Sequence, residues 1–349
     1  MLHASSCDWQ ALEDRGGNAI ESAHLRNDRV SMSRPGIEAI AHAYGSRRCD
    51  NAATGAKHGF DADFVRNKIG IETRYERGPA EATSDLAIAA GRTLLERSAT
   101  PAAQIECLVV VTQTPDYQLP HTSALVQHAL GLPPSIPAFD VGLGCSGFVY
   151  GLDVASAFMA GNGFRLGMLI TADAYSSVID PADRATAPLF SDAASATLLG
   201  ERPLYRLGRA VYGTDGSGAD RLIVKGGGSR SPSTHERLFM DGRAIFNFMM
   251  TRVPISVREC LERNAVREDQ VDRWVFHQAS QYMLESLATR MKLARDKVVM
   301  AMRNCGNTVA SSIPIALEKI LAERHGTIVM SGFGVGLSWA TNVLRLEEA

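Results

Sequence analysis

The sequence predicts an α/β protein built from two duplicated halves. Short apolar runs alternate with helix patterns, which is typical of a largely parallel sheet covered on both faces. The order of these elements then repeats in the second part of the chain. When the two parts are aligned, Thr112 corresponds to His277, Cys145 to Asn307 and Thr171 to Ser331. This repetition indicates an internal duplication.

The composition is that of an ordinary globular enzyme. The 349 residues include 45% hydrophobic residues, and the net charge of −2 gives no basic surface for nucleic acid. No run of eighteen apolar residues is present, and the N-terminus lacks a signal-peptide pattern. The six cysteines are irregularly spaced without a CxxC, so we expect no zinc or other metal site and no disulfide framework. We therefore expect a cytoplasmic protein with reduced thiols.

Three segments are predicted from these patterns. Residues 1–33 are polar without sustained periodicity and are interpreted as an N-terminal extension. Residues 34–205 form the first half and residues 206–349 the second. The glycine-rich stretch 212–233 is expected to be a long loop, of the kind that carries function or caps a pocket.

The elements of the first half follow from apolar runs and helix periodicity. Ser84 or Asp85 is expected to cap a helix that ends near Arg97, because both residue types accept hydrogen bonds from free helical N–H groups. Two further helices are predicted at 61–68 and 123–130, and a third follows Cys145 as far as residue 160. The predicted strands are 37–43, 105–112, 136–141, 166–171 and 194–199.

The second half repeats this pattern with fewer predicted elements. The predicted strands are 273–277, 298–302, 327–331 and 337–346, and the predicted helices are 281–291 and 311–321.

Cys145 is the candidate nucleophile. It follows an apolar strand that breaks at Gly142 and Gly144, and a helix begins directly after it. A helix N-terminus carries free N–H groups and about half a positive charge, so this position favours a thiolate, as in a nucleophile elbow. The alternative is a small core cysteine. His277 ends a strand and Asn307 holds the position equivalent to Cys145, so a duplicated fold brings the three side chains together.

A dinucleotide-binding site is a weaker interpretation of the same stretch. Residues 142–147 fit the spacing GxGxxG. No acidic residue ends a strand about twenty residues further on, as a ribose-binding site requires.

Four motifs together resemble those of the β-ketoacyl-acyl-carrier-protein synthase III family. They are the segments 140–148 around Cys145, 276–280 with His277, 306–314 with Asn307 and the glycine-rich 332–339. The resemblance covers residue 36 to the end of the chain. It implies a thiolase-like fold, with two α/β halves stacked as a five-layer αβαβα sandwich, and a homodimer.

The resemblance also implies a reaction, a decarboxylating Claisen condensation of an acyl-coenzyme A primer with malonyl-acyl-carrier protein in fatty acid or secondary-metabolite biosynthesis. Cys145 would carry the acyl group, and His277 and Asn307 would stabilise the enolate. The backbone N–H groups of Cys145 and Val335 would form the oxyanion hole. Coenzyme A and the carrier protein enter as substrates, and no cofactor is expected.

Other family positions carry over with differences. Arg184 and Phe64 correspond to the pair that holds the adenine of coenzyme A, with phenylalanine in place of tryptophan. Leu119 corresponds to a residue that lines the partner subunit's acyl pocket, where leucine leaves room for a primer longer than acetyl. Ser280 replaces an asparagine of the family, and Tyr282 replaces an arginine that is associated with carrier docking.

These departures leave two alternative functions. The first is acyl transfer from Cys145 to an acceptor other than malonyl. The second is a non-catalytic subunit of a heterodimeric synthase. That alternative predicts an eroded triad, whereas Cys145, His277 and Asn307 are all present.

Overall fold

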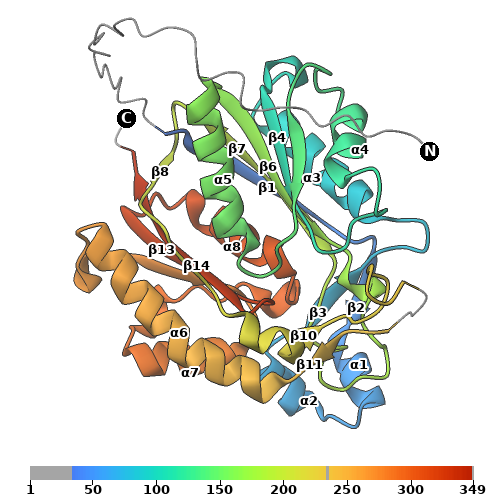
Figure 1. The fold of residues 1–349 in the computed structure, drawn as a ribbon. Coiled ribbons are helices and arrows are strands. Elements are labelled where there is room, and N and C mark those ends of the chain that lie inside the picture. The colour runs from blue at the N-terminus through green and yellow to red at the C-terminus, as the bar shows by residue number, and fades with distance from the viewer. Residues whose placement is uncertain (1–33, 233–235, 348–349) are drawn as a thin grey trace, which may run out of the picture. The chain divides into compact units, whose positions relative to one another are not determined.

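The computed structural model describes residues 34–232 and 236–347 (Figure 1). The predicted extension 1–33 lies outside these residues. Within the described ranges, ten strands form one hydrogen-bonded sheet, in which β1 and β8 meet through the single pair Ile37–Tyr205. This seam separates the strands of the first repeat from those of the second.

The first repeat has the strand order β5-β4-β6-β7-β1, with β4 parallel to its neighbours β5 and β6, and β7 antiparallel to β6 and β1. The buried strands are rich in Val, Leu, Ile and Ala, as expected for a sheet covered on both faces. The strands are β1 (Gly36–Tyr44), β4 (Cys107–Val111), β5 (Ala138–Val141), β6 (Leu166–Asp173) and β7 (Ala193–Gly200), and the helices are α3 (Thr83–Arg97), α4 (Thr122–Ala129) and α5 (Gly147–Asn162).

The second repeat has the same order and the same strand directions. An isolated parallel bridge between Val298 and Trp274 takes the place of β5, and β12, β13 and β14 follow toward the seam. The strands are β8 (Tyr205–Leu207), β9 (Val211–Thr214), β12 (Arg273–Phe276), β13 (Thr327–Gly334) and β14 (Ser338–Leu346), and the helices are α6 (Gly242–Arg263), α7 (Gln281–Met291) and α8 (Ser312–Leu321). The predicted boundary at residue 205 falls within β8.

Several short helices and strands lie outside the large sheet and its covering helices. They are β2 (Arg47–Asp50), α1 (Asn51–Lys57), α2 (Ala62–Phe64) with a π-helical turn at Val65–Ile69, β3 (Thr73–Glu76), and the paired strands β10 (Leu222–Ile223) and β11 (Phe239–Met240). Among the residues that the structure describes, no helix is both long and apolar enough to cross a membrane.

Helices α5 and α8 form the middle layer of the sandwich (Figure 1). Each packs between the strands of the two repeats, so each is buried on nearly all sides and correspondingly apolar. Gly147 and Gly151 let α5 approach β4, because a Cβ at either position would lie under 3 Å from the side chain of Val111. Helices α3 and α4 cover one outer face, and α6 and α7 cover the other.

Three predicted elements differ in the structure. Helix α3 begins at Thr83 after Ala82, and Asp85 accepts from the Ala82 N–H (2.9 Å), so neither Ser84 nor Asp85 is the N-cap. The predicted strand 298–302 is reduced to the bridge at Val298, followed by a 3₁₀ turn at Met302–Asn304. The expected loop 212–233 contains β9, a 3₁₀ segment at Gly216–Arg221 and β10.

Helix α6 is absent from the sequence-based prediction. It contains Pro254, which cannot donate a helical hydrogen bond and usually ends a helix. Here the helix continues through the proline, because its buried side packs on β13 and β14.

Candidate active site

Cys145 lies in the tight turn between β5 and α5. The Gly147 N–H donates to the Gly144 carbonyl (2.7 Å), and Cys145 is 5% exposed. Two glycines of β13 lie against it. A Cβ at Gly334 would fall 3.0 Å from the Cys145 sulfur, and one at Gly332 would fall 2.5 Å from the Cys145 carbonyl oxygen. Only glycine lets the strand of the second repeat pass this close to the sulfur.

His277 follows β12 and is held by hydrogen bonds at its ring and at its backbone. Its Nδ1 is 2.7 Å from the Ser312 hydroxyl oxygen, and its backbone N–H donates to the Ser331 carbonyl (2.9 Å). The imidazole also packs edge-on against Phe333, with ring centroids 5.5 Å apart. Phe333 precedes Gly334, so the imidazole and the Cys145 sulfur contact neighbouring residues of β13.

Asn307 lies on the segment that leads into α8. Its N–H donates to the Leu189 carbonyl, and its own carbonyl accepts from the Ser191 N–H, both at 2.9 Å. Its side-chain Oδ1 accepts from the Val309 N–H (3.0 Å). The amide oxygen is thereby occupied, which leaves the Nδ2 group as the available donor. Val309 and Phe333 belong to the same buried cluster as Cys145, so the structure brings the three predicted catalytic residues into one region.

The electrostatics of the site differ from the sequence-based expectation for Cys145. Burial, and next the Asp173 carboxyl, raise the pKa of the thiol to about 12. The expected preference for a thiolate is therefore wrong for the resting site, since the loss of water outweighs the helix terminus. Burial also lowers the pKa of His277 to about 3. At neutral pH the site therefore holds a neutral thiol and a neutral imidazole.

This assignment predicts how Cys145 reacts with iodoacetamide. With a pKa of about 12 instead of 9.0, its thiolate fraction at pH 7 is about a thousandfold smaller than that of an ordinary thiol. The alkylation rate should therefore rise about tenfold per pH unit from pH 7 to 10 without a plateau. Peptide mass spectrometry gives the rate at this one cysteine, and the unfolded chain is the control with a plateau near pH 9. A plateau below pH 8 in the folded protein would contradict the assignment.

Asp173 is a buried residue of the site that the sequence analysis did not single out. Its Oδ1 accepts from the Gln113 N–H (2.9 Å), and burial raises the pKa of its carboxyl to about 8. Asp173 is the last residue of the apolar, buried strand β6. Burying a carboxyl is costly, so an aspartate at the end of an apolar run in the sequence could have indicated a functional residue. Ser312, which holds His277, gave no such signal because serines near helix starts are common.

The loop with Val335 is anchored to the Cys145 turn. The Ser338 hydroxyl donates to the Val335 carbonyl (2.7 Å), and the Ser146 hydroxyl lies 2.7 Å from that of Ser338. These bonds fix the peptide groups that the predicted oxyanion hole requires. Whether the Val335 N–H serves in it stays a prediction.

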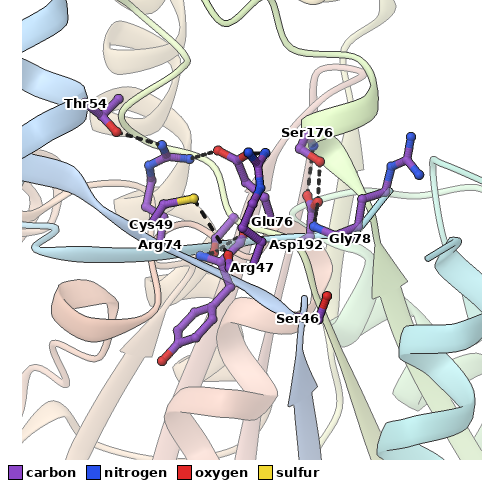
Figure 2. Close-up of polar contacts among 12 residues, drawn as sticks. Ser46, Arg47, Cys49, Thr54, Arg74, Glu76, Gly78, Ser176 and Asp192 are labelled. Atoms are coloured by element: carbon purple, nitrogen blue, oxygen red, sulfur yellow. Dashed lines mark hydrogen bonds and ion pairs between the residues drawn. The ribbon is translucent and has the colours of Figure 1, made fainter. Parts of the chain in front are cut away.

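A buried polar network holds residues 190–192, which lie next to Asn307 through the Ser191 N–H, and Figure 2 shows its members Arg74, Glu76, Ser176 and Asp192. Arg74 is 4% exposed and donates to Asn51 Oδ1 (2.8 Å), Glu76 Oε1 (3.1 Å) and the Phe190 carbonyl (3.0 Å). Asp192 accepts from the Ser176 N–H (2.8 Å), from the Ser176 hydroxyl and from the Arg77 N–H. Phe190 and Asp192 flank Ser191, whose N–H bonds to Asn307. The network therefore holds the segment whose Ser191 N–H binds the Asn307 carbonyl.

The predicted coenzyme A residues do not face an open slot. The Arg184 guanidinium lies over the ring of Phe60 (4.9 Å), and that ring stacks on Phe64 with centroids 4.6 Å apart. Phe60 therefore contacts both residues of the predicted pair.

The remaining predicted positions lie away from the sulfur. Leu119 is 87% exposed and does not line the cavity beside Cys145. Ser280 is the N-cap of α7 and accepts from the Met283 N–H, which explains a serine there. Tyr282 stacks on Phe246 and lies under the Lys68 amine. In the described part of the chain, no group of three or more His, Cys, Asp or Glu residues could hold a metal ion.

Comparison with known proteins identifies the family of this chain. Residues 139–216 match the model of 3-oxoacyl-[acyl-carrier-protein] synthase III, and residues 261–346 match the model of its C-terminal part. The β-ketoacyl-[acyl-carrier-protein] synthase III of Caldanaerobacter subterraneus is 35% identical over 298 residues, which are 82% of this chain and 90% of that relative.

Two similar solved structures are also those of synthases. A crystal structure of a 3-oxoacyl-(acyl-carrier-protein) synthase III has a TM-score of 0.85 at 35% identity, over 90% of this chain and 100% of that one. A priming β-ketosynthase from a polyketide biosynthetic pathway has a TM-score of 0.81 at 27% identity, over 90% of this chain and 97% of that one. The chain therefore belongs to the β-ketoacyl-acyl-carrier-protein synthase III family and has its thiolase-like fold.

Proposed function

We propose that this chain is an acyltransferase that condenses an acyl primer, held as a thioester on Cys145, with malonyl-acyl-carrier protein. The observation that carries the proposal is the convergence of Cys145, His277 and Asn307 from both repeats in one buried region. The family relationship supports a role in fatty acid biosynthesis, and the similarity to a priming ketosynthase supports a related role in secondary metabolism.

The first half-reaction transfers the primer. The Cys145 sulfur attacks the carbonyl carbon of the primer thioester, the bond to the donor sulfur breaks, and the donor leaves as a thiol with the proton that Cys145 loses. Because the Cys145 thiol is neutral in the resting site, this proton leaves the sulfur as the new bond forms and ends on the departing donor thiol. The backbone N–H groups of Cys145 and Val335 are the proposed donors to the oxyanion.

The second half-reaction forms the carbon–carbon bond. Malonyl thioester loses carbon dioxide, and the electron pair of the broken bond becomes an enolate. A neutral His277, with Ser312 at Nδ1, can donate from Nε2, and Asn307 donates from Nδ2 to the same oxygen. The enolate carbon attacks the acyl carbonyl and expels the Cys145 thiolate, which takes up a proton.

Intact-mass measurement tests the proposal. The protein is exposed to acyl thioesters of graded length, with Cys145→Ala as the control, and then to malonyl-acyl-carrier protein. We expect an adduct that the variant lacks, and that malonyl clears with release of carbon dioxide. An adduct that malonyl does not clear would instead indicate acyl transfer to another acceptor. The absence of an adduct with every thioester would indicate a non-catalytic subunit.

Phe60 gives a prediction about the acyl donor. We propose that coenzyme A stacks between Arg184 and Phe64 once the Phe60 ring moves out. Phe60→Ala should then lower the KM for acyl-coenzyme A about tenfold, the free energy of about one aromatic contact. The KM for the matching acyl-pantetheine, which has no adenine, should not change. An equal change for both donors would contradict an adenine site at this position.

We also propose a homodimer. Leu119, 87% exposed, and Tyr117, 60% exposed, lie on one loop of the single chain. A second copy that covers this loop would bury both side chains. Sedimentation equilibrium gives the mass in solution, and the mass of a single chain would exclude the dimer.

A further inference from the structure

A cavity of about 570 Å³ adjoins the Cys145 turn. Gln113, Tyr175, Val335 and Gly336 are among its lining residues, and Val335 and Gly336 directly follow the glycine that contacts the Cys145 sulfur. Much of the remaining wall is apolar and includes Val178, Leu222 and Leu238. Cys145 itself is not a lining residue, and the cavity lies next to residues that contact Cys145 and its turn.

Two polar side chains stand at the end of the cavity nearest the nucleophile. A Cβ at Gly144 would fall 2.2 Å from Gln113 Oε1, so the amide packs on the backbone of the residue before Cys145. The Tyr175 hydroxyl donates to that Oε1 (2.8 Å). Tyr175 is 4% exposed, and its ring stacks on Phe190 with centroids 5.1 Å apart.

The pair is held rigidly and keeps unused hydrogen-bonding capacity. The Gln113 backbone is fixed by Asp173, and the Tyr175 ring by Phe190. The tyrosine proton is used by Gln113 Oε1, which leaves the phenol oxygen as an acceptor and the Gln113 Nε2 group as a donor. Nε2 makes no hydrogen bond with the residues that the structure describes. Burial holds the pKa of Tyr175 well above its usual value, so the phenol stays protonated.

We propose that the Gln113–Tyr175 pair selects an acyl primer that carries a hydroxyl group close to its thioester carbon. This proposal rests on the proposed function, in which Cys145 holds the primer. A hydroxyl both donates and accepts, so it can pair with the phenol oxygen and with Nε2 at once. A plain alkyl primer would exclude water from the site and leave the phenol oxygen and Nε2 without hydrogen-bond partners. Sites built to bind a substrate hydroxyl discriminate strongly against analogues that lack it. The apolar wall beyond accommodates the rest of the chain.

The test compares 3-hydroxybutyryl with butyryl, each as the coenzyme A and the pantetheine thioester, by the rate of Cys145 acylation. We expect the hydroxylated primer to react at least ~10-fold faster with the wild type. Tyr175→Phe and Gln113→Met, which keep most of the volume, should each reduce the ratio of the 3-hydroxybutyryl rate to the butyryl rate to about threefold or less. Tyr205→Phe removes another buried phenol hydroxyl, which donates to the His325 carbonyl (2.9 Å) away from the cavity, and should leave the preference unchanged.

Equal rates for both primers in the wild type, or a preference retained in both variants, would overturn the proposal. The malonyl chase separates it from the proposed function. A preference for the hydroxylated primer with an adduct that malonyl does not clear would support the selection and reject the condensation. If malonyl clears every adduct but the two primers react at the same rate, the condensation is supported and the selection of a hydroxylated primer is rejected.

Discussion

Asn307→Leu is expected to lower the condensation rate by two to three orders of magnitude, about 10²–10³-fold, while Cys145 still takes up its acyl group. The leucine has nearly the same volume but no donor for the enolate oxygen. Primer transfer does not form that enolate, so the first half-reaction keeps its rate. Single-turnover mass measurements give the two rates separately, from the formation of the adduct and from its clearance by malonyl.

The control for this variant is Asn304→Leu, which removes an exposed amide three residues earlier. It should leave both rates unchanged. If Asn307→Leu slowed adduct formation as much as adduct clearance, Asn307 would be shaping the whole site and not acting on the second half-reaction.

Arg74→Leu is expected to reduce the free energy of unfolding by about 3–5 kcal/mol, the usual cost of removing one partner from a buried ion pair. The variant leaves Asn51 Oδ1 and the Phe190 carbonyl without their donor in the interior. Glu76 also loses its buried partner, as Figure 2 shows for the Arg74–Glu76 pair. Denaturant unfolding measures the change. The clearance of the acyl adduct should slow as well, because Phe190 lies on the segment that fixes Asn307.

Arg47→Leu is the matched control, because Arg47 pairs with the same Glu76 from a side chain that is 63% exposed. An exposed pair is worth about 1 kcal/mol or less, so this variant should stay close to the wild type. Equal losses in the two variants would show that the ion pair with Glu76, and not the buried contacts of Arg74, accounts for the stability.

Much of the fold could be predicted because apolar periodicity reports burial directly. The runs at 105–112 and 166–171 became β4 and β6, and the repeated order of elements became two repeats with the same strand order. Cys145 and Asn307 were brought together for the same reason, since equivalent turns of a duplicated fold meet at one place.

The remaining features depend on contacts that are distant in the sequence. Helix α6 passes through Pro254 because its packing outweighs the lost hydrogen bond, which no local pattern reveals. The Cys145 thiol stays neutral because of burial, a property of the whole site. Gln113 and Tyr175 are 62 residues apart and meet only because β4 and β6 are neighbours.

The shared strand order of the two repeats has a consequence for how this activity can be inherited. In the proposed reaction, one repeat carries the sulfur that stores the acyl group, and the other carries the imidazole and the amide that stabilise the enolate. Neither copy holds a complete set of reacting groups. A single ancestral repeat could have formed a complete set of reacting groups only as a dimer of identical copies. Once the two repeats carried different reacting groups, neither repeat could be lost or replaced without loss of the activity.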